Sequence, residues 1–318
     1  MMKLFQKRQI MPEAVPVPPP EPAPVAPPPP RPPMTALGRT LMGFRCADCD
    51  DIPKVADAGT IVDRNGASFQ IMHNGLEVVA GGYHGDWMAH LIRGLKGHHE
   101  PQEEAAFQEI VRRSRHNTLI VELGAFWSYY SLWYLKQVPG SSAVAIEPDE
   151  GNLDIGRRNA THNGLVGAMT FHRATIGGEA QAEVSFLQES TNTSVVVPMV
   201  DFAAVHALAG FRHIEVLHLD TQGAETPFLR SLPENAGDLI RFVVASTHHR
   251  VISGSPSTHE DCLDALRSRG ATILTEHNVQ ESFSGDGLIV ASFAAEDLDL
   301  PFPQVSRNAP ELSLFPNP

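Results

Sequence analysis

The sequence of 318 residues is poor in cysteine, in basic residues and in long apolar runs, and each shortage excludes a class of protein. Three cysteines cannot form a disulfide framework, which favours a reducing, cytoplasmic location. No apolar run approaches the roughly 18 residues that a membrane span needs. The 24 Lys and Arg residues face 37 Asp and Glu residues, and the resulting net charge of −13 repels phosphate backbones and argues against nucleic-acid binding.

Half of the prolines are concentrated near the amino terminus, since 13 of the 26 lie within Pro12–Pro33. Proline lacks the amide donor that helices and sheets need, so we predict that residues 1–33 form a disordered, partly polyproline II tail. Such a tail either tethers and solubilises the protein or binds a polyproline-recognising domain, and composition does not separate the two. With 42% apolar residues in the whole chain, the remainder can bury a core.

Residues 34–116 are mixed in pattern and predict a small N-terminal accessory or lid region. Within it, Ser68–Val79 predicts two short strands around an Asn-Gly turn signal. Apolar spacing predicts a helix over Trp87–Leu95. A second helix is expected to begin at Pro101, with acidic residues in its first turn and basic residues in its last, as the helix dipole favours.

Residues 117–296 alternate between apolar, strand-like runs and helical segments, the pattern of a parallel sheet with helices on both faces. The last two strands follow each other without a helix, so we expect the final strand to run antiparallel. We predict an α/β fold, the doubly wound, Rossmann-like methyltransferase sheet of seven strands, followed by a C-terminal tail at 297–318. The strand-like segments are Thr118–Leu123, Ala143–Ile146, Met169–Arg173, Glu183–Leu187, Glu215–Leu219, Arg241–Ala245, Thr272–Thr275 and Leu288–Ser292, and the helices are Trp127–Val138, Asp149–His162, Asp201–Leu208, Glu225–Ser231 and Ser257–Arg269.

Polar or small residues follow nearly every predicted strand, at the edge where open α/β sheets bind ligands. Gly124 follows the first strand, and Glu147 ends the second, where a carboxylate can accept hydrogen bonds from both hydroxyls of a ribose. A pyrophosphate-binding turn needs glycines at positions that here hold Gly124, Phe126 and Tyr129. The bulky side chains and the nearby acid argue against a dinucleotide and favour the cationic groups of S-adenosylmethionine (SAM).

Three segments, VELGAFWSYYSLWYLK, AIEPDEGNLDIGRRNATHNG and LHLDTQGAE, resemble in order and spacing the FkbM family of SAM-dependent methyltransferases. The resemblance covers roughly residues 117–293. It implies methyl transfer from SAM to a small-molecule or glycan acceptor, at a hydroxyl of a sugar, a polysaccharide or another natural product. The chain departs from the family at Phe126, where Asn is common, and at Ser128, where Gly is common, which indicates a divergent branch with its own acceptor.

The resemblance also assigns cofactor contacts by position. Glu122, Gly124 and Ala125 would line the methionine end of SAM, Glu147 would hold the ribose, and Asp220 would face the sulfonium and the acceptor. Ala174 and Thr175 would flank the adenine. The residues expected to contact the cofactor are therefore Glu122, Gly124, Ala125, Phe126, Glu147, Pro148, Ala174, Thr175 and Asp220.

An alcohol is a poor nucleophile at neutral pH, so a base must take its proton as the new bond forms. His248 suits this role by its intrinsic pKa and Asp220 by its position, and His249 is a third candidate. If His248 is the base, activity should rise with pH through about 6.5. The residues expected to contact the acceptor are His98, His99, Glu100, Tyr129 and Glu225.

Three clusters allow both a functional and a structural interpretation. Five of the seven Trp and Tyr residues lie within Trp127–Tyr134, and we favour helix-to-sheet packing over an aromatic wall around a cation. Two histidines and three glutamates lie within Gly97–Glu104, which is a metal site, a lid over the acceptor or a solvated helix start. Cys46 and Cys49 form a lone C-x-x-C motif without a second pair. Adjacent histidines rarely converge on one ion, so we expect no metal.

Two rival functions stay open. The first is a nicotinamide-dependent oxidoreductase on a Rossmann-like fold, which the missing glycines disfavour. The second is a non-catalytic binding module with the same fold, which the presence of Glu147, Asp220 and the histidine pair disfavours. Titration with both cofactors would separate the first rival from a methyltransferase, and binding without turnover would support the second.

Overall fold

The computed structural model of the chain describes residues 35–299 and 301–315. The proline-rich tail predicted for residues 1–33 lies outside this range. Within the range, no helix has both the length and the apolar character that crossing a membrane requires.

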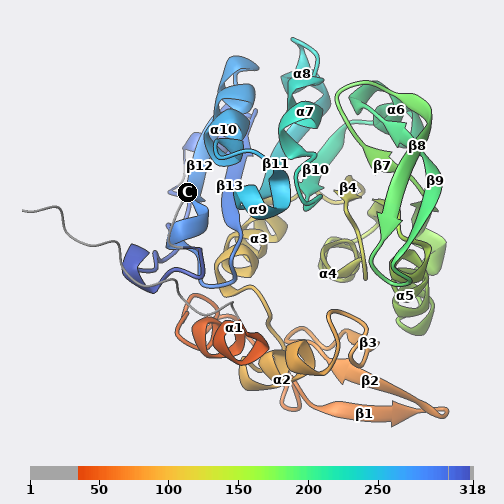
Figure 1. Ribbon diagram of the computed structural model, residues 1–318, viewed down its shortest axis with the longest axis vertical. Helices are drawn as coiled ribbons and strands as arrows, with labels where there is room; N and C mark the ends of the chain where they lie inside the picture. The colour runs from red at the N-terminus through yellow and green to blue at the C-terminus, as the bar shows by residue number, and fades with distance from the viewer. Residues whose placement is uncertain (1–34, 300, 316–318) are drawn as a thin grey trace, which may run out of the picture. The chain divides into compact units, whose positions relative to one another are not determined.

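A seven-stranded sheet forms the centre of the described chain (Figure 1). Its strand β13 runs antiparallel to both of its neighbours, and the other pairs are parallel. This confirms the predicted seven-stranded α/β sheet with its final strand antiparallel. In spatial order the strands are β12 (Thr272–His277), β13 (Gly287–Ser292), β11 (Ile240–Thr247), β10 (Ile214–Leu219), β4 (Leu119–Leu123), β5 (Ser142–Ile146) and β6 (Met169–His172).

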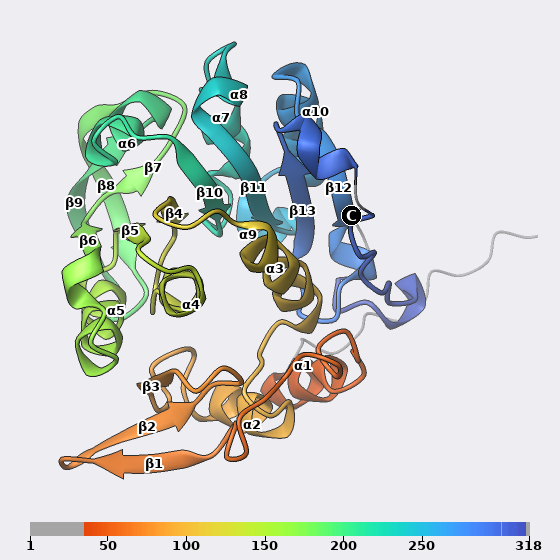
Figure 2. The same cartoon turned by 180° about the vertical axis from the view of Figure 1, so that it is seen from behind.

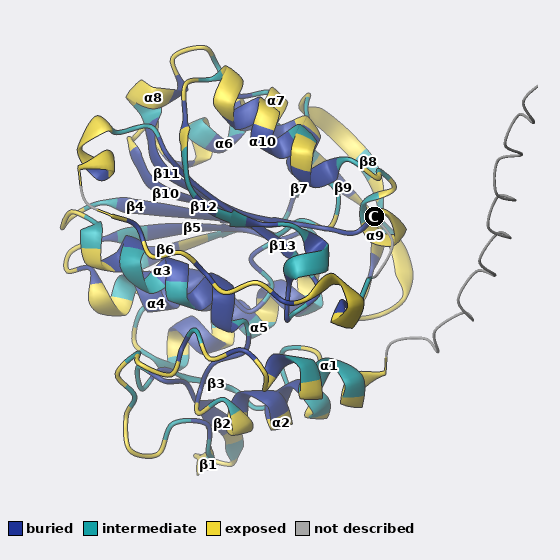
Figure 3. Cartoon of the chain, turned by 90° about the vertical axis from the view of Figure 1, so that its left-hand side faces the viewer, coloured by how far each residue is buried: buried dark blue, intermediate teal, exposed yellow. Residues whose placement is uncertain are grey.

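Helices cover both faces of this sheet (Figures 2 and 3). Successive residues of β4 point to opposite faces, so that Ile120 enters one hydrophobic core and Val121 the other. All five residues of β4 are buried, which explains why parallel strands read as nearly continuous apolar runs. One face carries α3 (Pro101–Arg113), α4 (Tyr129–Gln137) and α5 (Glu150–His162), and the other carries α6 (Phe202–Leu208), α7 (Glu225–Arg230), α8 (Ala236–Leu239) and α10 (Thr258–Ser268).

The helix after β4 begins two residues later than predicted, at Tyr129 instead of Trp127. Phe126 and Ser128 have φ angles of 40° and 59°, in the left-handed region that a right-handed helix cannot include. By contrast, α5 begins only one residue after the predicted Asp149, because Asp149 is its N-cap and its side chain accepts a hydrogen bond from the Gly151 N–H at 2.9 Å.

The described part of the N-terminal region combines α1 (Ala36–Gly43), a three-stranded antiparallel sheet and α2 (Asp86–Gly94). The two strands expected within Ser68–Val79 are present as β2 (Ala67–Ile71) and β3 (Glu77–Val79). The third strand, β1 (Ile61–Arg64), was not predicted. It is a largely exposed edge strand without an apolar face, so its sequence carries no alternation.

A second three-stranded sheet packs beside the main one and contains a segment expected as a strand of the alternating series, Glu183–Leu187. That segment is β8 (Gln181–Gln188), and it pairs antiparallel with β9 (Thr193–Val200), which was not predicted. Pro198 within β9 argues against a strand, yet it is tolerated here. The sheet is completed by β7 (Thr175–Ile176), parallel to β9.

The described residues of the predicted C-terminal tail at 297–318 pack against the rest of the chain. Phe302 and Val305 are only 8% and 9% exposed and join the core that holds α3 and α4. The Asn308 side chain donates a hydrogen bond to the Ser282 carbonyl at 3.1 Å. The remaining short helices are α9 (Arg250–Ser253), η1 (Val166–Ala168), η2 (Val279–Glu281), η3 (Ala295–Leu298) and η4 (Pro310–Leu312).

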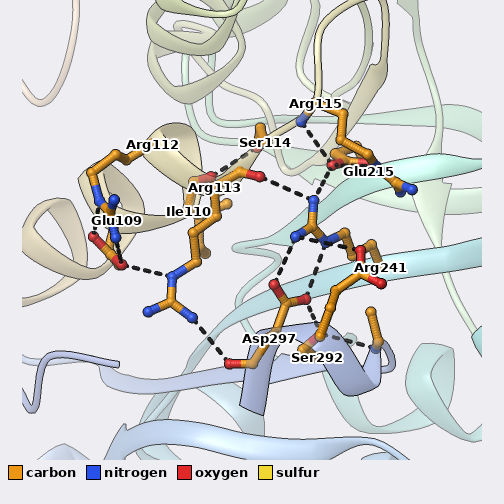
Figure 4. A network of polar contacts seen from close by, with 12 residues as sticks. Glu109, Ile110, Arg112, Arg113, Ser114, Arg115, Glu215, Arg241, Ser292 and Asp297 are labelled. Atoms are coloured by element: carbon orange, nitrogen blue, oxygen red, sulfur yellow. Dashed lines mark hydrogen bonds and ion pairs between the residues drawn. The ribbon is translucent and has the colours of Figure 1, made fainter. Parts of the chain in front are cut away.

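A buried ion network ties η3 to the amino-terminal ends of the central strands, opposite the edge where ligands are expected (Figure 4). The Arg241 guanidinium lies 2.7 Å from both the Glu215 and the Asp297 carboxylates. Its side chain is 8% exposed, and theirs are 0% and 2% exposed. The Ser292 hydroxyl also donates to Asp297, at 2.6 Å. Removing the arginine would leave the buried Asp297 carboxylate without this cationic partner, whereas Glu215 would keep its ion pair with Arg115 at 2.6 Å.

We therefore expect Arg241→Ala to lower the free energy of unfolding by about 3–5 kcal/mol, the usual cost of leaving a buried charge unpaired. Arg230→Ala is the matched control, because its pair with Asp261 is exposed, at 60% and 32%, and should contribute at most about 1 kcal/mol. Denaturant unfolding of both variants measures the difference. Equal, small losses would show that the network contributes nothing specific to stability.

Candidate functional site

A cavity of about 340 Å³ opens at the carboxyl ends of the central strands. There β4 lies between β10 and β5. The chain passes from β4 to β5 on one side, and it later returns to form β10 on the other side of β4. At such a reversal of strand order the two loops diverge and leave a crevice for a ligand. Every residue predicted to contact the cofactor lines this cavity: Glu122, Gly124, Ala125, Phe126, Glu147, Pro148, Ala174, Thr175 and Asp220.

The loops after β4 and β10 touch at Gly124. Its φ angle is +74°, and a Cβ atom placed there would lie 1.7 Å from the Asp220 carbonyl oxygen. The Asp220 N–H donates to the Leu123 carbonyl at 2.9 Å, so the two loops are also hydrogen-bonded. Glycine is thus required twice, by conformation and by space, and this contact fixes where Asp220 enters the cavity.

Glu147 places a buried carboxyl group between the loops after β4 and β5. It is 6% exposed and accepts hydrogen bonds from the N–H groups of Phe126 at 3.1 Å and Asp149 at 2.9 Å. Burial raises its pKa to about 8, although these hydrogen bonds oppose the shift. A carboxyl group fixed in this way offers a ligand with two adjacent hydroxyls a preorganised partner.

A second cavity, of about 270 Å³, adjoins the first and shares part of its wall. Asp220 is the one predicted catalytic residue that lines both cavities, and His248 lines the second. Residues of the N-terminal region form part of this wall. The residues common to both cavities are Tyr83, His84, His99, Glu100, Glu189, Asp220 and Gln222.

Three carboxylates surround the His248 imidazole. Its Nδ1 lies 3.0 Å from Glu225, and its Nε2 lies 3.2 Å from Asp220 and 3.7 Å from Asp286. Burial alone would lower the pKa of His248, but the acids outweigh it and raise the pKa well above 6.5. These acids therefore favour the charged imidazole, whereas a His248 base with a pH dependence near 6.5 needs the neutral form.

Asp286 is a further titratable group of the second cavity. Burial raises its pKa to about 7, while the charge on His248 opposes the shift. This residue was not selected from the sequence. The signal that could have found it is its position directly before the last strand of the sheet.

The residues predicted to contact the acceptor separate into two groups. His99 and Glu100 line both cavities, whereas Glu225 lies behind His248 and accepts from the Gly223 N–H at 2.9 Å. The structure does not bring His98 or Tyr129 to either cavity, because both side chains are fully buried behind the wall.

His249, the third candidate base, also lies outside both cavities. Its side chain accepts the Val251 N–H at the start of α9, and its ring stacks on Phe315 at 4.4 Å between centroids. Adjacent side chains at a strand end point in different directions, which is why His248 and His249 have different surroundings.

The aromatic cluster is mostly packing, as predicted, but its two cavity-lining members are Trp127 and Tyr130. Trp133 and Tyr134 are fully buried in the core. Tyr83, which belongs to no motif in the sequence, stacks on Trp127 with ring centroids 4.6 Å apart. This contact joins the N-terminal region to the loop after β4.

No known family profile matches the sequence, and no curated protein matches it. Solved structures do resemble it at low similarity. TrmK of M. capricolum, in complex with S-adenosyl-homocysteine, has a TM-score of 0.37 and 14% identity over 65% of this chain and 72% of its own. The Bacillus cereus O-methyltransferase in complex with SAH has 0.36 and 16%, over 60% and 80%. The Geobacter metallireducens precorrin-6y C5,15-methyltransferase has 0.37 and 10%, over 60% and 86%.

The close approach at Gly124 predicts a large effect of one methyl group. Gly164 is the matched control, because its φ is +70° and none of the described atoms beyond its neighbours lies within 4 Å of the point that a Cβ atom would occupy. Gly164→Ala should lower the free energy of unfolding by about 1–2 kcal/mol, which is the cost of holding alanine in a left-handed backbone conformation. Gly124→Ala should lower the free energy of unfolding by at least about 1–3 kcal/mol more, because the backbone at Asp220 must also move away from the new methyl group. Equal losses in thermal or denaturant unfolding would contradict the described contact.

Proposed function

We propose that this protein is a SAM-dependent methyltransferase that binds SAM in the first cavity and an acceptor hydroxyl in the second. The observation that carries the proposal is the junction of the two cavities at Asp220, with Glu147 buried on the far side of the first. The resemblance to the FkbM family supports the same interpretation. In this arrangement the nucleoside of SAM is held at Glu147 and the acceptor lies in the second cavity, the acceptor chamber. The loops after β4 and β10 lie between them.

The lining of the first cavity fits SAM better than a dinucleotide. Among residues 35–299 and 301–315, no lysine or arginine lines it, while Glu122, Glu147, Asp149, Glu189 and Asp220 do. Pyrophosphate would meet the acidic side chains of Asp149, Glu189 and Asp220 there, and the turn after β4 carries Phe126 in place of a second glycine. A cationic ligand with a ribose is compatible with both features, which disfavours the oxidoreductase alternative.

Bound SAM would supply an electrophilic methyl group on a sulfonium. In this proposal Glu147 accepts from the ribose hydroxyls, and Ala174 and Thr175 flank the adenine. Glu122 and the turn at Gly124 and Ala125 line the methionine end. These residues bind and orient, and they exclude water from the reacting groups.

The second cavity offers an acceptor polar groups of both charge signs. Its wall includes the acidic side chains of Glu100, Glu189, Asp220 and Asp286, and it also includes Arg39 and His248. Aromatic side chains and histidines complete a lining that combines apolar ring faces with hydrogen-bonding groups. We therefore place a hydroxyl of a sugar or another polyhydroxylated natural product in this chamber.

Asp220 is the base of this proposal, and His248 is its positioning partner. Asp220 is the member of the pair that lines both cavities, so it can reach the acceptor hydroxyl beside the cofactor. His248 keeps its proton at neutral pH, so it holds the Asp220 carboxylate by a charge-assisted hydrogen bond at 3.2 Å. Glu225 fixes the other side of the imidazole.

Glu147→Ala should weaken binding of S-adenosylhomocysteine by roughly 30- to 150-fold, which corresponds to the ~2–3 kcal/mol of lost hydrogen bonds between a carboxyl group and the ribose. Glu150→Ala is the control, because Glu150 lies just three residues further on, with 47% of its side chain exposed, and pairs with Arg157. Calorimetry on both folded variants measures the change. Unchanged affinity in Glu147→Ala, or binding of a nicotinamide dinucleotide instead, would overturn the assignment of the first cavity.

Asp220→Asn should lower turnover by about 10²–10⁴, the usual effect of losing a general base, with cofactor affinity retained. His248→Gln should lower turnover by a smaller factor. His249→Ala should leave turnover unchanged, because the His249 side chain lies outside both cavities. Transfer of labelled methyl groups to a panel of sugars and other hydroxylated acceptors, followed from pH 5 to 9, provides the measurement. A larger loss in His248→Gln, with a wild-type rate that rises through pH 6.5, would make His248 the base.

A further inference from the structure

The C-x-x-C motif and the histidine-rich segment, which the proposed function leaves largely unused, meet in the folded chain. Cys49 lies in the turn after α1, His98 precedes α3, and Glu104 lies in the first turns of α3. One ligand atom from each of these residues, including the Cys49 Sγ, lies within 4.8 Å of the other two. Cys46, the other cysteine of the motif, points elsewhere, with its Sγ 3.7 Å from the Ser306 hydroxyl.

We propose that Cys49, His98 and Glu104 bind a divalent transition-metal ion of the zinc class. A thiolate, an imidazole and a carboxylate are the ligands that zinc prefers in proteins. The three residues are 4%, 0% and 0% exposed, so they lie in the interior and not on a solvated acidic surface.

The surroundings of this cluster hold its side chains in place. Glu104 accepts from the His99 N–H at 2.7 Å and from the Tyr129 hydroxyl at 3.4 Å. The ring of His73 stacks on that of His98, with centroids 4.2 Å apart. Supporting hydrogen bonds and packing of this kind orient the ligands of protein metal sites.

An independent observation points to a missing partner at the imidazole. His98 bonds the Glu104 carboxylate through its Nδ1 atom, while its Nε2 atom is buried and has no hydrogen-bond partner among the residues that the structure describes. A buried ring nitrogen without a partner is unfavourable, and coordination would satisfy it. Ion binding releases the Cys49 thiol proton, which now points to the Pro101 carbonyl at 3.2 Å, and a metal–sulfur bond replaces it.

The position of the cluster indicates a structural role. None of the three ligands lines either cavity, but the next residues, His99 and Glu100, line both. An ion at Cys49 would therefore anchor the wall between the N-terminal region and the acceptor chamber. This inference does not depend on the proposed function, since it concerns metal content and stability.

The test measures metal in the untagged, full-length protein by mass spectrometry after dialysis against a zinc-containing and then a metal-free buffer. We expect about one zinc ion per chain, a melting temperature that a strong chelator lowers, and recovery on adding zinc. Cobalt in place of zinc should give a near-ultraviolet band from sulfur-to-metal charge transfer. Cys49→Ser should lose the band and the metal, and Cys46→Ser, the matched control, should keep both.

Wild-type protein that is folded, holds no zinc after the zinc dialysis and shows no cobalt band would overturn the proposal. Equal loss of metal in Cys46→Ser and Cys49→Ser would overturn the assignment of ligands as well. Because the wild-type measurements stand alone, they decide the question even if Cys49→Ser does not fold, and His98→Gln then provides the second variant.

Discussion

The contact between Gly124 and the Asp220 backbone is the constraint on which the rest of the site depends. It brings the loops after β4 and β10 together at the point where the order of the strands reverses. No residue other than glycine fits at position 124 without moving the backbone. From this contact Asp220 projects toward both cavities, and the turn that follows Gly124 donates the Phe126 N–H to Glu147. One close approach of two loops thus fixes the positions of both Glu147, the proposed ribose-binding group, and Asp220, the proposed base.

Charge determines how the second cavity can act. His248 lies among Glu225, Asp220 and Asp286, and these acids favour its protonated form by raising its pKa. In the proposed mechanism it therefore holds a carboxylate and does not accept a proton.

The sheet and the lining of the first cavity could be predicted from sequence because both follow local rules: buried strands are apolar runs, and small or polar residues follow strand ends. The individual positions came from the three segments that resemble the FkbM family, although no family profile matches the chain. What local rules cannot supply is contact between distant segments. Tyr83, Arg39 and Asp286 line a cavity that exists only when the N-terminal region and the last strands close over the same edge. Tyr130 lines the first cavity and Tyr129 does not, and the residues with left-handed backbone before α4 set where this helix starts. Cys49 and His98 likewise meet only in the folded chain.

The central claim is that one ligand lies between Glu147 and Asp220 with its reactive end toward the second cavity. A crystal structure with S-adenosylhomocysteine tests it most directly. The account predicts the ribose hydroxyls within hydrogen-bonding distance of the Glu147 carboxyl group and the sulfur facing the junction at Asp220. A nucleoside bound elsewhere, or bound in the reverse direction with its adenine at Asp220, would contradict it.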